Sequence, residues 1–383
     1  MSTLTQRVVH VAPRVQSRGG IETLLAYHRA LPGPQVFVSL FDRQPQVRPG
    51  YVNLGVTWRT PLWLMRERFR RALAPYPGSL LVYHNAWGLP LFHDLDGASR
   101  RVIFLHADPA YHRPDLPGCA GLIDGALGCC PEFAAAWPEI LPELPPARTA
   151  IYRMPLGPVA SAAPERTAGG LIVLGYAGRV ERAQKCLHLL PEFVRILAAR
   201  GVDFRFEVVG DGSLKPWLEK RAGDRVHFHG WVPSNADYQR VFAAWDAAVY
   251  FSDHEGGPIA LMEAMRTGAV PFYPTRAGGW GEYFTPQVDP RCHYPAADLT
   301  ALAAAIEEIF RRPAEDIAAL RAKARRLVAD HDIEGYTVGC RELLDRVAGL
   351  PRLSVPRARP WRLTDSLPLG LVTRAMPAAL RGS

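Results

Sequence analysis

Two glutamates, Glu255 and Glu263, lie eight positions apart around the start of a predicted helix. The apolar run 247–251 before them predicts a buried strand, and Gly256 and Gly257 predict a tight turn. Pro258 is expected at the first position of the helix. The helix itself is apolar nearly all round, which predicts burial. A buried carboxylate is costly without a hydrogen-bond partner, so we expect Glu263 to have one. Glu255 lies beside backbone amides that favour an anion.

Two cations precede another predicted helix, which is expected to run from Cys186 to Arg200. Gly178 and Arg179 follow the apolar strand 170–177, and Lys185 comes six positions after the arginine. The N-terminal end of a helix carries partial positive charge, and both side chains add to it. Together they favour a diphosphate. An ordinary pair of solvated cations is the alternative.

Further candidates lie where predicted strands end. Gly19 and Gly20 follow the strand 7–12, and His84 and His106 each end a strand of their own. Ligands of α/β domains gather at the carboxyl ends of parallel strands. A neutral histidine ring donates or accepts one hydrogen bond to a hydroxyl. The alternatives are a histidine that only caps a strand and a glycine pair that only makes a turn.

Two strands of the second half end in similar loops. Gly210 ends the strand 204–209, and Trp231 and Val232 follow the strand 226–229. A tryptophan and a valine there are able to pack on a planar ligand. A place in the hydrophobic core is the alternative for the tryptophan.

The order and spacing of these residues resemble the retaining GT-B glycosyltransferases of family four. Glutamate, seven residues and glutamate, with Gly-Gly-Pro-Ile between, is similar to that family's signature. Gly-Arg followed by a lysine is similar to its diphosphate-binding pair. The family usually has glycine after that lysine, and here it is Cys186, which puts the local turn geometry in doubt. The resemblance runs from Val8 to Phe284.

The resemblance implies a role for each residue. Glu263 would hold the ribose hydroxyls of a UDP- or GDP-sugar, and Glu255 would orient the transferred sugar. The acceptor would attack from the leaving-group face and a phosphate oxygen would take its proton, so no enzymic nucleophile is required. Because the two cations take the place of a metal, no metal or other cofactor is required either. The implied catalytic residues are Glu255, His106, Arg179 and Lys185, and the implied nucleotide-sugar-binding residues are Gly19, Gly20, Gly178, Arg179, Lys185, Gly210, Trp231, Val232, Gly256, Gly257, Pro258, Ile259 and Glu263.

The alternation of strand and helix signals predicts an α/β protein with two Rossmann-like, doubly wound domains. We expect the GT-B arrangement, in which the two domains face a central cleft. The first domain, 1–160, would bind the acceptor, and the second, 165–340, the nucleotide-sugar. A proline- and alanine-rich linker, 138–164, would join them. The helix and basic, proline-rich tail 341–383 could pack back on the first domain.

Composition limits the location and the partners. The 383 residues are 48% hydrophobic and 21% charged, which is typical of globular proteins. The start of the chain shows no signal peptide, and six cysteines without metal-type spacing suit the cytoplasm. A net charge of +8 favours an anionic partner, but no nucleic-acid motif is present. The basic amphipathic helix 63–73 or the tail could contact the inner face of a membrane.

The resemblance predicts a retaining glycosyltransferase that moves a sugar from a nucleotide-diphosphate donor to a hydroxyl acceptor. The acceptor would be a cell-surface glycan or a glycolipid. A nucleotide-sugar epimerase on the same fold is an alternative, and so is a phosphorylase, although no lysine lies in a recognisable pyridoxal motif. A GT-B subunit that binds without catalysing is the non-enzymatic alternative.

Overall fold

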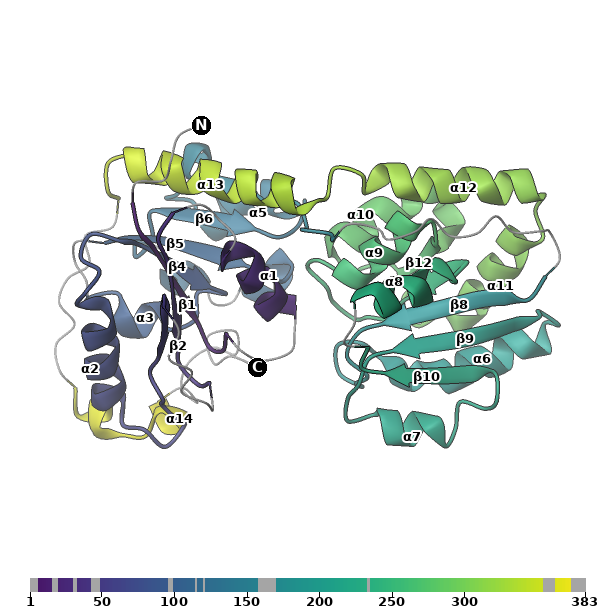
Figure 1. Cartoon of the computed structure of the whole chain (residues 1–383), viewed down its shortest axis with the longest axis horizontal. Helices are drawn as coiled ribbons and strands as arrows, with labels where there is room; N and C mark the ends of the chain where they lie inside the picture. Colours follow the sequence, from purple (N-terminus) through teal and green to yellow (C-terminus); the bar gives the residue numbers. More distant parts are fainter. Residues whose placement is uncertain are drawn as a thin grey trace. The chain divides into compact units, whose positions relative to one another are not determined.

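The computed structural model describes residues 6–15, 20–29, 33–42, 49–95, 99–113, 116–119, 121–157, 170–232, 235–353 and 362–372. The chain forms two compact units (Figure 1). Unit 1 comprises Met1–Pro155 and Ile333–Ser383, and unit 2 comprises Leu156–Asp332. Each unit is built on one parallel sheet with helices packed against it. The predicted α/β class with two Rossmann-like sheets is confirmed.

The sheet of unit 1 has the order β3-β2-β1-β4-β5-β6-β7. Strands β1, β4 and β5 form its buried middle, because their sequences are almost continuously apolar and helices cover them. The strands are β1 Val8–Ala12, β2 Gln35–Ser39, β3 Tyr51–Asn53, β4 Leu80–His84, β5 Arg100–Leu105, β6 Gly125–Gly128 and β7 Thr149–Ile151, and the helices from this part of the chain are α1 Gly20–Arg29, α2 Leu62–Leu73, α3 Leu89–Phe92, α4 Pro109–His112 and α5 Phe133–Ile140.

The sheet of unit 2 has the order β10-β9-β8-β11-β12-β13. It therefore repeats the strand order of a dinucleotide-binding sheet, with a reversal between β8 and β11. The strands are β8 Ile172–Ala177, β9 Phe204–Val209, β10 Val226–Gly230, β11 Ala247–Val249, β12 Val270–Pro274 and β13 His293–Tyr294, and the helices are α6 Leu190–Ala199, α7 Lys215–Glu219, α8 Asn235–Ala243, α9 Ile259–Thr267, α10 Gly279–Val288, α11 Leu299–Phe310 and α12 Ala314–Leu327.

The end of the chain returns to unit 1. Helix α13, Ile333–Gly349, packs on β5, β6 and β7 (Figure 1). The described piece 362–372, which holds α14 (Leu369–Val372), lies against the segment before α2, where the Gly370 amide donates to the Trp58 carbonyl at 2.8 Å. The division between the units falls at Asp332 and not at 340, because α13 is one continuous helix on unit 1.

Three local expectations differ from the structure. The proline-rich stretch expected to be a linker contains the edge strand β7, which continues the sheet of unit 1. The helix expected from Cys186 begins at Leu190, after a 3-10 turn. Pro258 precedes the first residue of α9, whereas we expected it in the first helical position. None of the helices in the described ranges is long and apolar enough to cross a bilayer.

Candidate active site

The strand reversal in unit 2 brings two predicted ligand loops together. β8 and β11 are neighbours in the sheet, although β9 and β10 lie between them in the sequence. One loop, 178–186, follows β8, and the other, 250–258, follows β11. The two loops touch, since the Asp253 amide donates to the Gln184 carbonyl at 2.9 Å. Loops at such a reversal line the crevice where doubly wound sheets bind ligands.

Two of the predicted glycines allow the strand ends to approach each other. A Cβ atom on Gly210 would lie only 2.0 Å from the carbonyl oxygen of Gly178. Both residues also have positive φ angles, 127° and 152°, which side chains rarely adopt. Glycine is therefore required here by the packing of the loops. Contact of either residue with a nucleotide stays a prediction.

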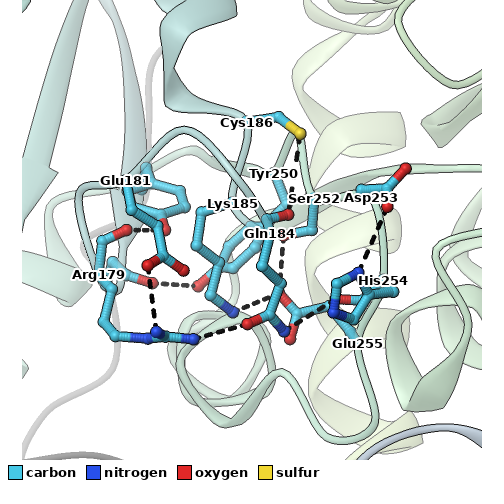
Figure 2. A network of polar contacts seen from close by, with 12 residues as sticks. Arg179, Glu181, Gln184, Lys185, Cys186, Tyr250, Ser252, Asp253, His254 and Glu255 are labelled. Atoms are coloured by element: carbon cyan, nitrogen blue, oxygen red, sulfur yellow. Dashed lines mark hydrogen bonds and ion pairs between the residues drawn. The ribbon is translucent and has the colours of Figure 1, made fainter. Parts of the chain in front are cut away.

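Lys185 and Glu255 form an ion pair between the two loops (Figure 2). The ammonium donates to Oε1 of Glu255, and the Ser252 hydroxyl donates to the same oxygen at 2.7 Å. The side chains are 14% and 5% exposed respectively. The Glu255 amide also donates to the Ala277 carbonyl at 2.6 Å, which holds the loop. The predicted sugar-orienting carboxylate and a predicted diphosphate-binding cation are thus paired with each other.

Arg179, the second predicted cation, lies in a more open place. Its guanidinium donates to Glu181 at 3.1 Å and to the side-chain oxygen of Gln184 at 2.6 Å. Gln184 in turn donates to the His254 carbonyl at 2.9 Å (Figure 2). The arginine side chain remains 59% exposed. The network therefore connects both cations to the loop that carries Glu255, and its exposed arginine is accessible to an anion.

Cys186 has the left-handed backbone conformation, with φ of 50°. The resembling family usually has glycine at this position. The chain keeps the left-handed turn with cysteine, at a steric cost that glycine would not have. The Cys186 thiol makes only weak contacts, to the carbonyl oxygens of Ala183 (3.4 Å) and Gln184 (3.8 Å).

Replacing Cys186 by glycine is expected to raise the free energy of unfolding by about 0.5–1 kcal/mol. Relief of left-handed strain gains about 1–2 kcal/mol, and the greater freedom of unfolded glycine returns part of it. Urea unfolding measures the difference. Cys186→Ala is the control, because it loses the thiol but keeps the strain, and equal stability of the two variants would contradict the argument.

Glu263 lies on α9, and Tyr238 of α8 donates to its Oε2 at 3.0 Å. This bond supplies the partner that a buried carboxylate needs. Burial raises the pKa of the Glu263 carboxyl to about 7, although the tyrosine bond and the charge of Arg266 act in the opposite direction. The carboxyl lines a small pocket together with Gly157, Tyr238, Gln239, Phe242, Arg266 and Thr267. A ribose contact stays a prediction.

His106 of unit 1 belongs to a chain of hydrogen-bonded rings. Its Nδ1 lies 2.7 Å from the Tyr152 hydroxyl, and its Nε2 lies 2.8 Å from Nδ1 of His84. The chain continues from His84 Nε2 to His10 Nδ1 at 3.1 Å, and from His10 Nε2 to the Gln35 side-chain oxygen at 3.0 Å. All four contacts are hydrogen bonds between neutral groups if the Tyr152 hydroxyl donates to His106 and each ring then donates to the next group, ending at the Gln35 oxygen.

Burial keeps these rings uncharged. It lowers the pKa of His10 to about 4 and that of His106 to about 3, and it holds the pKa of His84 well below its usual range. Both ring nitrogens of His106 contact other side chains. A sugar hydroxyl would therefore have to replace Tyr152 or His84, and the predicted role of His106 at the sugar stays a prediction. His84, the weaker candidate, is an interior link of the chain.

The remaining predicted residues have mixed surroundings. Trp231 is 51% exposed after β10, with Val232 beside it. Gly256 approaches α10, where a Cβ atom on Gly279 would lie 2.4 Å from the Gly256 carbonyl. Gly257 and Pro258 lead into α9, whose first residue is Ile259. Gly20 begins α1, and Gly19 lies outside the described residues.

Sequence reasoning missed Ser252, Gln184 and Tyr238. Ser252 and Gln184 are close in sequence to the predicted residues Glu255 and Lys185, so a search for polar neighbours in the sequence could have found them. Tyr238 precedes Glu263 by 25 residues and meets it only through the packing of α8 on α9. Among the described residues, no group of three or more His, Cys, Asp or Glu could hold a metal ion.

Comparisons with known proteins match the segment that carries the candidate site of unit 2. Residues 172–312 match the family model for "Glycosyl transferases group 1". A relative from Salmonella typhimurium, named "Putative colanic acid biosynthesis glycosyltransferase WcaL", is 28% identical over 253 residues, which are 62% of this chain and 59% of the relative. An Escherichia coli K12 relative of the same name is 29% identical over 44% of this chain and 43% of its own. The chain thus spans less than two thirds of either relative.

Solved structures show the same fold. Sucrose-phosphate synthase from Thermosynechococcus elongatus has a TM-score of 0.67 with 16% identity, over 89% of this chain and 99% of its own. Anabaena HepE in complex with UDP has a TM-score of 0.65 with 16% identity, over the same shares of the two chains. The matched family segment contains the loops of Arg179, Lys185 and Glu255 as well as Glu263. Residues 172–312 of this chain are therefore similar to the group 1 glycosyl transferases, and the chain has the GT-B fold.

Proposed function

We propose that the protein is a retaining glycosyltransferase that transfers a sugar from a nucleoside-diphosphate donor to a hydroxyl acceptor. Unit 2 binds the donor and unit 1 binds the acceptor. The observation that carries the proposal is the cluster of Arg179, Lys185 and Glu255 at the strand reversal of unit 2. It combines cations for a diphosphate with a carboxylate for hydroxyl groups. The family match of the same segment supports it.

The chemical work in this proposal is electrostatic. Cleavage of the sugar–phosphate bond places negative charge on the diphosphate, and Arg179 and Lys185 supply fixed positive charge to receive it. Glu255 and Glu263 accept hydrogen bonds from the sugar and the ribose. A phosphate oxygen takes the acceptor's proton, so no side chain has to act as a nucleophile or base. Because the two cations neutralise the leaving group, the proposed reaction runs without a metal.

The same comparisons support the proposed partners. HepE is solved in complex with UDP and glucose, and the WcaL relatives are named for colanic acid biosynthesis. We therefore propose a nucleotide-sugar as the donor and a cell-surface glycan or glycolipid intermediate as the acceptor. The proposed location is the cytoplasm, at the inner face of the membrane.

A thermal-shift screen against UDP, GDP and ADP tests the proposal. A ligand that binds only the folded protein at 100 times its Kd stabilises it by about 2.7 kcal/mol, so the cognate nucleotide should raise the melting temperature. NMR analysis of the product then distinguishes a transferred, anomerically retained sugar from an epimerised donor. Turnover that persists in EDTA is expected. Absence of any shift would contradict the proposal, and complete loss in EDTA would contradict its metal-free part.

The membrane contact rests on an exposed apolar surface of unit 1. This surface, the α2–α14 patch, consists of Trp58, Trp63, Leu363, Leu367 and Leu371, which are 42–80% exposed. On the expected basic face of α2, Arg66 is held in a largely buried pair with Asp94 at 2.7 Å, whereas Arg70 and Arg71 pair with Glu67 and stay exposed. Tryptophan and leucine side chains suit the boundary between head groups and acyl chains.

Replacing both Trp58 and Trp63 by alanine is expected to reduce binding to phosphatidylglycerol vesicles by about tenfold or more, since each buried tryptophan contributes on the order of 1–3 kcal/mol. Cosedimentation measures the bound fraction. Tyr283→Ala, at a side chain of unit 2 that is 50% exposed, is the matched control. Equal binding by the double variant and the control would contradict a membrane role for the patch.

A further inference from the structure

Lys185 and Glu255 neutralise each other at the place where a diphosphate is expected. Their ion pair is largely buried, and Ser252 and the Ala277 carbonyl hold the glutamate in position. A buried carboxylate that loses its cation remains desolvated and uncompensated. Separation of this pair is therefore unfavourable unless another donor takes the place of the ammonium.

A nucleoside diphosphate competes with Glu255 for this ammonium. The ammonium has three N–H donors, so it is able to contact both anions at once. That arrangement, however, brings the phosphate and the carboxylate close together in a site with little water, where like charges repel strongly. A bound diphosphate thus either takes the cation from Glu255 or faces its negative charge.

A sugar on the diphosphate changes this balance. Its hydroxyl groups donate hydrogen bonds, so they can replace Lys185 as partners of Glu255 and leave the ammonium to the phosphates. We propose that Glu255 is a specificity-determining residue through which unit 2 prefers a nucleotide-sugar to the nucleoside diphosphate that remains after transfer. This inference rests on the proposed glycosyltransferase function. It adds a role for the ion pair. After transfer, Glu255 binds Lys185 again, which weakens the hold on the nucleoside diphosphate and favours its release.

The other carboxylate of the network provides an internal control. Glu181 is 23% exposed and pairs with Arg179, which is 59% exposed, whereas Glu255 and Lys185 are only 5% and 14% exposed. Exposed ion pairs contribute little, because water solvates the partners when they separate. Glu181→Gln removes the same unit of charge from the same network. Comparing Glu181→Gln with Glu255→Gln therefore separates the effect of net charge from the effect of Glu255 competing for Lys185.

Isothermal titration of UDP and UDP-glucose, or of GDP and GDP-mannose, tests the inference. Glu255→Gln keeps the shape of the side chain and removes its charge. We expect it to bind the nucleoside diphosphate about tenfold more tightly than the wild type, in line with the coupling of buried charge pairs, and to change nucleotide-sugar affinity less. Ser252→Ala should weaken nucleoside diphosphate binding, because Glu255 then depends on Lys185 more strongly. Glu181→Gln should tighten binding by less than about threefold.

The outcomes separate the two proposals. If Glu255→Gln binds the nucleoside diphosphate no more tightly than the wild type does, the role of Glu255 is wrong while the proposed function stands. A gain for Glu181→Gln as large as that for Glu255→Gln would reduce the effect to net charge and also overturn the inference. If the folded wild type binds none of these nucleotides, the proposed function fails and the inference fails with it. Melting temperatures of all variants confirm that each is folded.

Discussion

Alanine in place of Lys185 is expected to lower the turnover number by about 10²–10³-fold, the usual cost of removing one group that stabilises charge in a transition state. The ammonium lies at the strand reversal of unit 2, and in the proposed reaction it receives the growing charge of the diphosphate. Replacing Arg179 as well should lower turnover further. Initial-rate kinetics at saturating donor measure the effect. An unchanged rate in the double variant would remove the leaving-group role of both cations.

The same substitution also affects the fold. Lys185→Ala leaves Glu255 buried with Ser252 as its remaining side-chain donor among the residues that the structure describes, and a buried pair broken on one side costs about 3–5 kcal/mol. Arg179→Ala should cost less, about 1 kcal/mol, because the arginine is 59% exposed and water reaches its ion pair with Glu181.

A second variant therefore separates chemistry from stability. Lys185→Ala combined with Glu255→Gln has no unpaired buried charge, so urea unfolding should recover most of the lost stability. Its turnover should remain well below that of Glu255→Gln alone, which keeps the ammonium of Lys185. Recovery of both quantities would show that Lys185 acts only through the folding of the loop.

The strands that position the site could be predicted because their signal is local. β8 and β4 are continuous apolar runs, typical of strands covered on both faces, and glycine or proline marks the loops that follow. β7 was missed because it is three residues long, lies at the sheet edge and follows a run of prolines. The return of α13 to unit 1 was open in the sequence, since an amphipathic helix pattern shows which face is buried but not against which sheet.

The partners of the site residues depend on contacts between distant segments. Lys185 and Glu255 are 70 positions apart, and His106 and Tyr152 are 46 apart. Residue type and spacing indicated that a cation and a carboxylate would both serve a nucleotide-sugar. The spacing did not show that Lys185 and Glu255 would bind each other when no nucleotide-sugar is present, because that contact depends on the register of β8 and β11. The same limit applies to the ring chain, whose five residues lie on or directly after β2, β1, β4, β5 and β7 of unit 1.

Replacing Glu263 by alanine is expected to weaken binding of the nucleoside diphosphate by about 100-fold or more. In the proposed site its carboxylate accepts hydrogen bonds from the ribose hydroxyls, and each bond to a charged group contributes about 1.5–3 kcal/mol. Isothermal titration at pH 8, where the carboxyl is ionised, measures the loss. Glu334→Ala, at a glutamate of α13 in unit 1, is the control and should bind normally. Normal binding by Glu263→Ala would sink the ribose assignment.

The pH dependence of this binding gives a sharper test, because burial raises the pKa of Glu263 to about 7. A protonated carboxyl is a poorer acceptor, so nucleotide affinity should fall as pH drops below 7, by up to about tenfold per unit. The β-phosphate titrates in the same range, and Glu263→Gln retains that contribution, so the difference between the wild type and this variant isolates the glutamate. Tyr238→Phe removes a bond that lowers the pKa, and its transition should move to higher pH.

The same carboxyl should destabilise the empty protein. Its pKa is higher in the folded state than the 4.5 of an unfolded chain, so its stabilising contribution is complete below pH 4.5 and is lost as pH rises through 7. Glu263→Gln should therefore be about 3 kcal/mol more stable than the wild type at pH 8, with little difference at pH 4.5. If Glu263 serves ligand binding at a cost in stability, its replacement by glutamine should make the protein more stable and the nucleotide bind more weakly. A structural carboxylate would lose stability on the same substitution, so urea unfolding at the two pH values decides between the roles.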